Sequence, residues 1–209
     1  MRIVKEASER RNEILDVAEK LFCTRGYDNT STNDILAEIG IARGTLYYYF
    51  KSKEDILDAM IDRSLGEIMT KASHIALDES VPVLERLTKT VLAANVDTKA
   101  GDMILEQVHQ PQNALMHAKM QEKLINQLMP LFMKIIADGI SQGLMQTDYP
   151  EDTIQMLLIY SNSVFDDSIE YSEEEKKRKV LAFISNTEIL LHMEKGSLFE
   201  AMLPMFYRK

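Results

Sequence analysis

The sequence predicts an all-α protein, and three observations point to that fold class. Only 8 glycines and 5 prolines interrupt the 209 residues, so most segments between them are long enough for helices. Within those segments the apolar residues recur at spacings of three and four rather than alternating. Hydrophobic residues make up 45% of the chain and charged residues 27%, a balance typical of a globular protein. We expect two helical domains, residues 1–52 and residues 53–209.

The first three expected helices are short and closely spaced. The first ends at Gly26, and Ser31 with Asp34 forms a capping signal for a second helix that ends at Gly40. A third helix follows from about Arg43 to Tyr49. Two short helices joined by a tight turn containing glycine predict a helix-turn-helix. The first helix has one apolar stripe, formed by Ile14, Leu15, Ala18, Leu21 and Phe22.

The remainder of the chain is also expected to be helical. A capping signal from Ser52 to Asp55 begins a long fourth helix. Pro130 lies inside an otherwise helical run, so it either begins a helix or kinks one. Oppositely charged pairs four residues apart in 173–179 favour a solvated helix start over a nuclear localisation signal. Five or six further helices are separated by breaks near Pro82, Gly101, Pro111, Gly143, Pro150, Tyr171 and Gly196.

Charge and cysteine content narrow the cellular setting. The net charge of −9 argues on its face against a nucleic-acid partner, but residues 1–53 carry +1 and the remainder −10. Cys23 is the only cysteine, so an intramolecular disulfide is impossible. The chain has neither an apolar leader nor a run of roughly 18 apolar residues. We therefore expect a cytoplasmic protein without a membrane span.

The third helix has the composition that DNA reading requires, with small and polar residues flanked by groups that bind phosphate. Arg43 is suited to guanine, Thr45 offers a methyl group to thymine, and Gly44 lets the backbone approach closely. Tyr47 and Tyr48 lie on different sides of the helix, so one can contact a phosphate while the other reaches a base. The candidate DNA-binding residues are Thr30, Ser31, Thr32, Arg43, Gly44, Thr45, Tyr47, Tyr48, Lys51 and Lys53.

Each of these residues has a plainer explanation when it is taken alone. Ser31 and Ser52 serve as helix caps whether or not DNA is present. Tyr49 is better explained by packing, and Arg43 or Lys53 alone by a solvated surface. Their combination at these spacings favours DNA binding.

A denser pattern runs from residue 22 to residue 54. Its members are Phe22, Gly26, Tyr27, Thr30, Ser31, Ile35, Gly40, Gly44, Thr45, Leu46, Tyr47, Phe50, Ser52, Lys53 and Glu54. With these residues the chain resembles the DNA-binding region of the tetracycline-repressor (TetR) family of bacterial transcriptional regulators. The resemblance implies that Tyr47 contacts phosphate and that Tyr48 takes a variable, base-facing position. It also implies an effector pocket among the central helices and a dimer formed by two helices per subunit.

A dimer is expected on physical grounds too, because one helix-turn-helix buries too little surface for tight specific binding. Residues 154–165 and 180–191 are apolar nearly all round, as in helices that are buried on both sides. The alternative is that both helices are interior to a monomer. The candidate dimer residues are Ile154, Leu158, Ser161, Phe165, Phe183, Ile184, Thr187 and Leu191.

Methionines suggest where an effector binds. Of 13 methionines, 12 lie at or after Met60, and flexible methionine side chains line adaptable apolar cavities, although core packing is the commoner role. Glu106 and His109 are spaced as metal ligands, but no second such pair accompanies them, so neither a metal nor a cofactor is expected. The candidate effector-binding residues are Met103, His109, Met116, Met120, Met133 and Tyr160.

Together these observations predict a ligand-responsive transcriptional repressor. We expect a homodimer that binds a palindromic operator in double-stranded DNA and is released by a small, apolar effector. No nucleophile and base pair or phosphate-binding loop indicates an enzyme. The alternative is an all-α carrier or enzyme that uses the methionine-rich cavity without DNA. Membrane association through an amphipathic helix lacks the basic face it needs.

Overall fold

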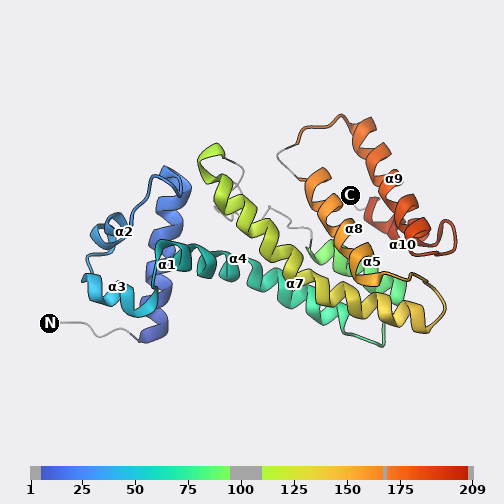
Figure 1. The fold of residues 1–209 in the computed structure, drawn as a ribbon, viewed down its shortest axis with the longest axis horizontal. Coiled ribbons are helices and arrows are strands. Elements are labelled where there is room, and N and C mark those ends of the chain that lie inside the picture. The colour runs from blue at the N-terminus through green and yellow to red at the C-terminus, as the bar shows by residue number, and fades with distance from the viewer. Residues whose placement is uncertain (1–5, 95–109, 167–168, 207–209) are drawn as a thin grey trace. The chain divides into compact units, whose positions relative to one another are not determined.

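The computed structural model describes residues 6–94, 110–166 and 169–206, and every regular element in those ranges is a helix (Figure 1). The predicted all-α class is therefore confirmed. The elements are α1 (Ala7–Arg25), α2 (Thr32–Ile39), α3 (Arg43–Tyr49), α4 (Lys53–Ala76), α5 (Val83–Ala94), the 3-10 turn η2 (Pro111–Asn113), α7 (Ala114–Ser141), α8 (Pro150–Val164), α9 (Glu173–Leu190) and α10 (Ser197–Phe206).

The described residues fall into two compact units. The first unit contains residues 6–66 and 110–123, and the second contains residues 67–94 and the described residues from 124 onward. Both α4 and α7 therefore contribute to both units. The first unit extends beyond residues 1–52, because it includes the amino-terminal parts of these two helices.

Local capping signals determine where the helices of the helix-turn-helix begin and end. The Ser31 hydroxyl accepts a hydrogen bond from the Asp34 backbone N–H at 3.2 Å, and the Asp34 carboxylate accepts one from the Ser31 N–H at 2.8 Å. At the other end of α2, Gly40 adopts a left-handed conformation with a φ of 73°, which glycine accommodates without strain. Leu46 anchors α3 in the core. The predicted apolar stripe of α1 is fully buried.

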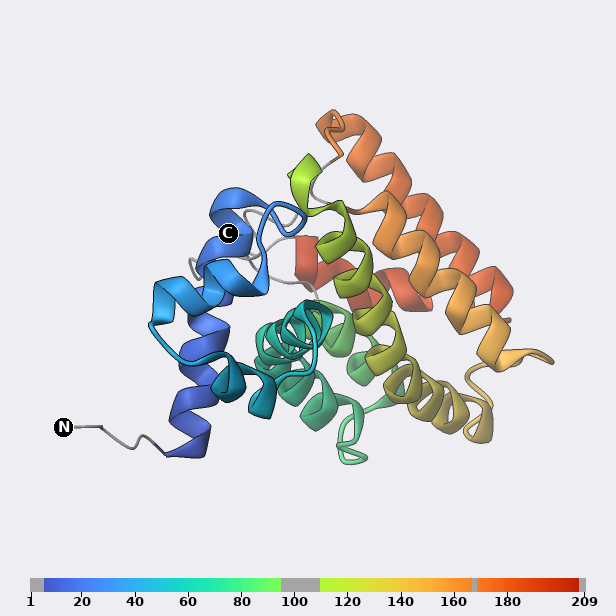
Figure 2. The same ribbon diagram turned by 60° about the vertical axis from the view of Figure 1, so that its left-hand side comes forward.

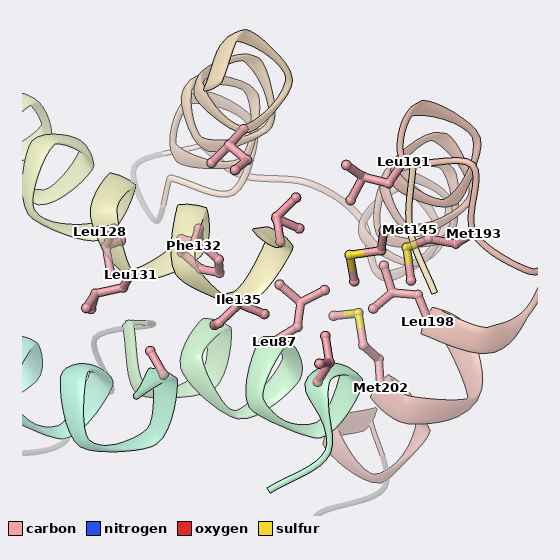
Figure 3. Close-up of a cluster of buried hydrophobic side chains, with 14 of the residues drawn as sticks. Leu87, Leu128, Leu131, Phe132, Ile135, Met145, Leu191, Met193, Leu198 and Met202 are labelled. Carbon is pink, nitrogen blue, oxygen red and sulfur yellow. The ribbon is translucent and has the colours of Figure 1, made fainter. Parts of the chain in front are cut away.

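The second unit has its own hydrophobic core, contributed by α4, α5 and the helices from α7 onward (Figure 3). Phe132 and Ile135 of α7 belong to it, together with Leu191 at the end of α9 and Met202 of α10. Pro130 lies inside α7 rather than at its start, which decides between the two positions left open by the sequence.

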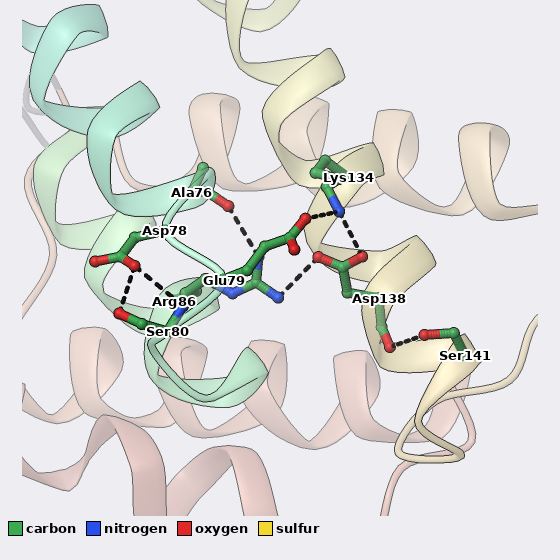
Figure 4. Close-up of polar contacts among 8 residues, drawn as sticks. All are labelled: Ala76, Asp78, Glu79, Ser80, Arg86, Lys134, Asp138 and Ser141. Atoms are coloured by element: carbon green, nitrogen blue, oxygen red, sulfur yellow. Dashed lines mark hydrogen bonds and ion pairs between the residues drawn. The ribbon is translucent and has the colours of Figure 1, made fainter.

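A buried arginine joins three elements of the second unit (Figure 4). The Arg86 side chain, on α5, is only 2% exposed and donates to the Asp138 carboxylate of α7 at 2.8 Å. It also donates to the backbone oxygen of Ala76, the last residue of α4, at 3.1 Å. Lys134 donates to both Asp138 and Glu79, at 2.7 Å each. The end of α4 is thus held beside α5 and α7.

A second buried charge, on Glu188, begins α10. Glu188 is 5% exposed, and its carboxylate accepts backbone N–H bonds from Gly196, Leu198 and Phe199 at 2.9–3.2 Å. These donors belong to the first turn of α10, where no earlier residue of the helix can accept from them. Glu188 therefore caps α10 from a different helix, and the partial positive charge of the helix start stabilises its carboxylate.

Candidate nucleic-acid interface

Helix α3 presents its polar and aromatic residues to solvent. Arg43 and Gly44 are exposed, Thr45 and Tyr47 are partly exposed, and the Tyr48 side chain is 74% exposed. The Tyr48 ring packs edge-on against Tyr49, with ring centroids 5.0 Å apart. This aromatic contact supports an otherwise solvated side chain in a defined position.

Tyr47 is the point where α2 and α3 meet through polar groups. The Thr32 hydroxyl, at the start of α2, and the Arg43 guanidinium lie beside its phenol, and together they lower the pKa of Tyr47. The Arg43 guanidinium also lies over the Tyr47 ring, 5.6 Å from its centroid. Three predicted DNA-binding side chains are therefore brought together where α2 begins and α3 passes.

Two other predicted DNA-binding residues use their polar groups inside the fold. Thr30 is 1% exposed, and its hydroxyl donates to the backbone oxygens of Gly26 and Leu21. The Lys53 ammonium donates to the Tyr27 backbone oxygen at 2.9 Å and lies 4.0 Å from the centroid of the Tyr27 ring. The structure thus gives both side chains a role in holding the loop before α2.

The remaining candidate residues lie at helix ends. Ser31 caps α2, and its hydroxyl and backbone N–H are both bonded to Asp34. Lys51 is exposed in the turn between α3 and α4, where its ammonium donates to the Tyr47 backbone oxygen at 3.2 Å. A basic side chain is therefore available beside the carboxyl end of α3.

Several basic side chains of α1 make contacts within the first unit. Lys20 of α1 pairs with Glu38 of α2 at 2.8 Å, and Arg25 lies 3.9 Å from Asp34. The Arg11 guanidinium lies 5.3 Å from the centroid of the Phe50 ring. Much of the basic charge on α1 is thus balanced by contacts within the first unit. The basic side chains of α3 and of the turn after it are then the main ones left to bind DNA.

The candidate effector residues that the structure describes are divided between the two units. Met103 and His109 lie outside the described residues. Met116 and Met120 are buried in the first unit, whereas Met133 is partly buried in the second unit. Tyr160 is 42% exposed on α8, also in the second unit. An open groove of about 650 Å³ follows the carboxyl-terminal part of α4 and is lined by Met69, Thr70, Ser73, His74, Leu77 and Asp78.

Half of the candidate dimer residues face the interior of the second unit. Four of them are buried within the single chain, namely Ile154, Ile184, Thr187 and Leu191. Leu158, Ser161 and Phe183 are half-buried, and the Phe165 side chain is 38% exposed. The predicted stripe therefore lies mainly on the core-facing side of α8 and α9.

Other apolar residues of α8 and α9 are exposed. The two helices lie side by side in the second unit (Figures 1 and 2). The Tyr160 ring stacks on Phe183 at 5.8 Å with an interplanar angle of 4°. We define the α8–α9 face as the exposed apolar residues on these helices, which are Met156, Ile159, Tyr160, Leu181 and Ile189.

Metal-binding clusters and membrane-spanning helices are both absent from the part of the chain that the structure describes. No group of three or more histidine, cysteine or acidic side chains is placed to hold a metal ion within those ranges. Among the helices that the structure describes, none combines the length and the apolar character that a membrane crossing requires.

A helix-turn-helix whose third helix presents arginine, threonine and tyrosine to solvent, followed by a larger helical region, defines a DNA-binding transcriptional regulator. Family models agree with this class. Residues 14–60 match the bacterial regulatory proteins of the tetR family, and residues 93–186 match a tetracyclin repressor-like C-terminal domain. The chain belongs to the tetracycline-repressor family, as the pattern from residue 22 to residue 54 predicted.

Similar proteins are regulators rather than enzymes. The chain is 25% identical over 148 residues to a fatty acid metabolism regulator protein of Bacillus subtilis (strain 168), a match that covers 71% of this chain and 75% of that protein. It is 37% identical over 98 residues to an HTH-type transcriptional regulator of Staphylococcus aureus (strain USA300), covering 46% of this chain and 53% of that protein. The chain thus spans about half the length of this second relative.

Solved structures share the fold. A putative TetR-family regulator from Syntrophomonas wolfei superposes with a TM-score of 0.58 at 26% identity, covering 85% of this chain and 94% of that one. The fatty acid degradation regulator FadR from Bacillus halodurans superposes with a TM-score of 0.57 at 22% identity, covering 77% of this chain and 84% of that one. At that identity the second likeness concerns the fold alone. This chain is a transcriptional regulator and not an enzyme.

Proposed function

We propose that the chain is a cytoplasmic, homodimeric repressor that binds a palindromic operator and leaves it when a small apolar molecule binds the second unit. The observation on which the proposal mainly rests is the group formed by Thr32, Arg43 and Tyr47 on the exposed side of α2 and α3. A guanidinium and two hydroxyl groups held side by side offer several hydrogen-bond donors to one phosphate oxygen, with the positive charge of Arg43 adding to the attraction. Tyr48, at the same helix, is exposed enough to reach a base edge.

The second copy of the chain is proposed to bind the α8–α9 face. Met156, Ile159 and Ile189 are each about half exposed or more in the single chain, although large apolar side chains are normally buried. A shallow groove of about 520 Å³ along α8 lies beside Met156 and Ile159. In a two-fold dimer each apolar residue is buried twice, once per subunit, so a small face contributes a substantial interface. The two α3 helices would then read two half-sites.

The effector is proposed to be apolar and to act on the second unit. Its core contains three buried methionines, Met145, Met193 and Met202, and three partly buried ones at its margin, Met69, Met129 and Met133, with side chains that adapt to irregular ligands. The Bacillus subtilis relative is described as a fatty acid metabolism regulator, which makes fatty acids the first compounds to test. An effector shifts the protein away from DNA only if it binds the released conformation more tightly.

The test begins with selection of duplexes from random DNA by the full-length chain, followed by fluorescence anisotropy with the selected operator. We expect Arg43→Ala and Tyr47→Ala each to weaken operator binding about 5-fold to 150-fold, as expected for losing one good contact. The matched control is Lys71→Ala, which removes an exposed cation on α4 in the second unit. Equal affinity of all four proteins would refute the proposed DNA-binding surface, and selection of no preferred sequence would refute operator binding.

Salt dependence provides an independent measurement on the same proteins. The first 53 residues carry a net charge of only +1, so we expect a shallow dependence of operator affinity on salt, with few phosphate contacts per subunit. Loss of Lys51 should reduce the slope by about one ion, because its exposed ammonium lies beside α3. A steep slope that Lys51→Ala leaves unchanged would contradict this account of the interface.

A further inference from the structure

Tyr27, in the loop between α1 and α2, is held by groups from two distant parts of the sequence. Its backbone N–H donates to the Asn113 side-chain oxygen at 3.1 Å, and its backbone oxygen accepts from the Lys53 ammonium at 2.9 Å. The Thr30 N–H donates to the same oxygen at 3.2 Å. The Tyr27 ring packs edge-on against Phe22, with centroids 5.0 Å apart. Both backbone polar groups of Tyr27, its N–H and its carbonyl oxygen, are therefore bonded to other elements.

The turn η2 is packed closely against this loop. Asn113 is fully buried, and a Cβ atom added to Gly26 would lie 2.8 Å from both Cβ and Cγ of Gln112. Gly26 also has a φ of +88°, a conformation that side chains other than glycine's rarely adopt. Gly26 is therefore required both by its own backbone and by the approach of residue 112.

Ion pairs fix the following part of α7 to α4 within the first unit. The Lys119 ammonium lies 2.6 Å from Glu54 and 3.3 Å from Asp58. The Lys123 ammonium lies 2.7 Å from Asp62 and donates to the Asp58 backbone oxygen at 2.9 Å. Residues 111–123 are thus attached to the helix-turn-helix by a buried hydrogen bond and to α4 by several charged contacts.

We propose that Asn113 is a positioning residue for DNA binding, an inference that rests on the proposed function. By accepting the Tyr27 N–H, Asn113 holds the loop from which α2 begins, and Thr32 at that start lies beside Tyr47 of α3. Lys53, the first residue of α4, donates to the carbonyl oxygen of Tyr27. Since α4 and α7 both continue into the second unit, Tyr27 is one residue of the helix-turn-helix that both segments hold, α4 through Lys53 and residues 111–123 through Asn113.

The expected effect follows from what Asn113→Ala removes. The substitution leaves the Tyr27 N–H buried without its acceptor, so the loop shifts to satisfy it and α2 and α3 lose their set orientation. We expect the dissociation constant for the operator to rise about tenfold. Binding to an unrelated duplex depends mainly on charge, which the substitution does not change, and so should stay the same.

The experiment compares the full-length chain, Asn113→Ala and the matched control Asn126→Ala, which removes an exposed asparagine from α7, the helix that follows η2. Two duplexes of equal length are titrated, the operator selected from random DNA and an unrelated sequence. The ratio of the two affinities is the readout, because a partly unfolded sample lowers both affinities equally. Hydrogen exchange over residues 24–30 reports in parallel whether the Tyr27 amide has lost its protection.

We expect Asn113→Ala alone to lower the affinity ratio about tenfold and to speed exchange of the Tyr27 amide. A second variant, Gly26→Ala, displaces the loop from Gln112 and should lower the ratio in the same way, which covers the case in which Asn113→Ala does not fold. An unchanged ratio in the folded variants would overturn the inference while leaving the proposed function intact. Absence of any operator preference in the unsubstituted chain would overturn both.

Discussion

The Arg86–Asp138 pair predicts that substitutions of its two residues are coupled, which a double-mutant cycle can measure. Asp138→Asn keeps the side-chain shape but removes the negative charge beside a guanidinium that is 2% exposed. Two unit charges about 4 Å apart interact by about 4 kcal/mol at an effective dielectric constant of about 20. Because the Asp138 side chain is 20% exposed and also accepts from Lys134, we expect a loss of about 2–3 kcal/mol in the free energy of unfolding.

The cost of Asp138→Asn should become smaller when the arginine is removed as well. Arg86→Met leaves the Ala76 backbone oxygen without its donor and should cost about 1–2 kcal/mol. In that background no buried cation remains, so adding Asp138→Asn should cost less than about 1 kcal/mol. The assay is urea unfolding followed by far-ultraviolet circular dichroism at pH 7, at one fixed protein concentration because the stability of the proposed dimer would depend on concentration. Equal costs of Asp138→Asn in both backgrounds, within about 0.5 kcal/mol, would refute the coupling.

The same pair predicts how the effect changes with pH. Hydrogen bonds from Lys134 and then Arg86 hold the pKa of Asp138 below its ordinary value of 3.8. A carboxyl whose pKa is lower in the folded state stabilises the fold above its unfolded pKa and loses that contribution as the pH falls through its folded pKa. The difference between the unsubstituted chain and Asp138→Asn should therefore be largest near neutral pH and shrink below about pH 4. A difference that stays constant into acid would contradict the assigned cause.

Two further substitutions test other features of the second unit. Glu188→Ala leaves three backbone N–H groups at the start of α10 without an acceptor and should lower the free energy of unfolding by about 2–4 kcal/mol. The control Glu194→Ala removes an exposed carboxylate and should change the free energy of unfolding little. Similar urea midpoints for the two variants would show that the cap is dispensable. Ile159→Glu places one charge from each subunit in the proposed two-fold interface at the α8–α9 face. It should raise the dimer dissociation constant about a hundredfold in sedimentation equilibrium. Leu77→Glu, at a similarly exposed leucine outside α8 and α9, is the control, and a dimer insensitive to Ile159→Glu would place the interface elsewhere.

Features that depend on neighbours in sequence were predictable, and features that depend on distant contacts were not. The capping box of Ser31 and Asp34 was predicted because its partners are three residues apart. The inward face of α8 was not, because that helix is apolar nearly all round and its pattern does not distinguish core from surface. Burial of Thr30 likewise depends on backbone oxygens of the preceding helix and loop.

The role of Asn113 had no signal in the sequence at all. It bonds to a residue 86 positions earlier, and an asparagine after a proline reads simply as a turn. Lys53 was predicted as a phosphate contact, since a lysine at a helix start near a recognition helix is suited to that role. The structure instead shows its ammonium bonded to Tyr27 and lying over the ring of that residue, a contact between α4 and the loop before α2.

The packing of Gln112 against Gly26 has a practical consequence for building chimaeric regulators. The family model for the amino-terminal region ends at residue 60, which makes that point an obvious place to exchange DNA-reading heads between relatives. If only the residues before this junction were exchanged, the loop that contains Gly26 would come from one protein and the turn η2 that packs against it from another. Residues 110–123 should travel with residues 6–66, so that the recipient acquires a complete unit rather than a head with an unmatched surface.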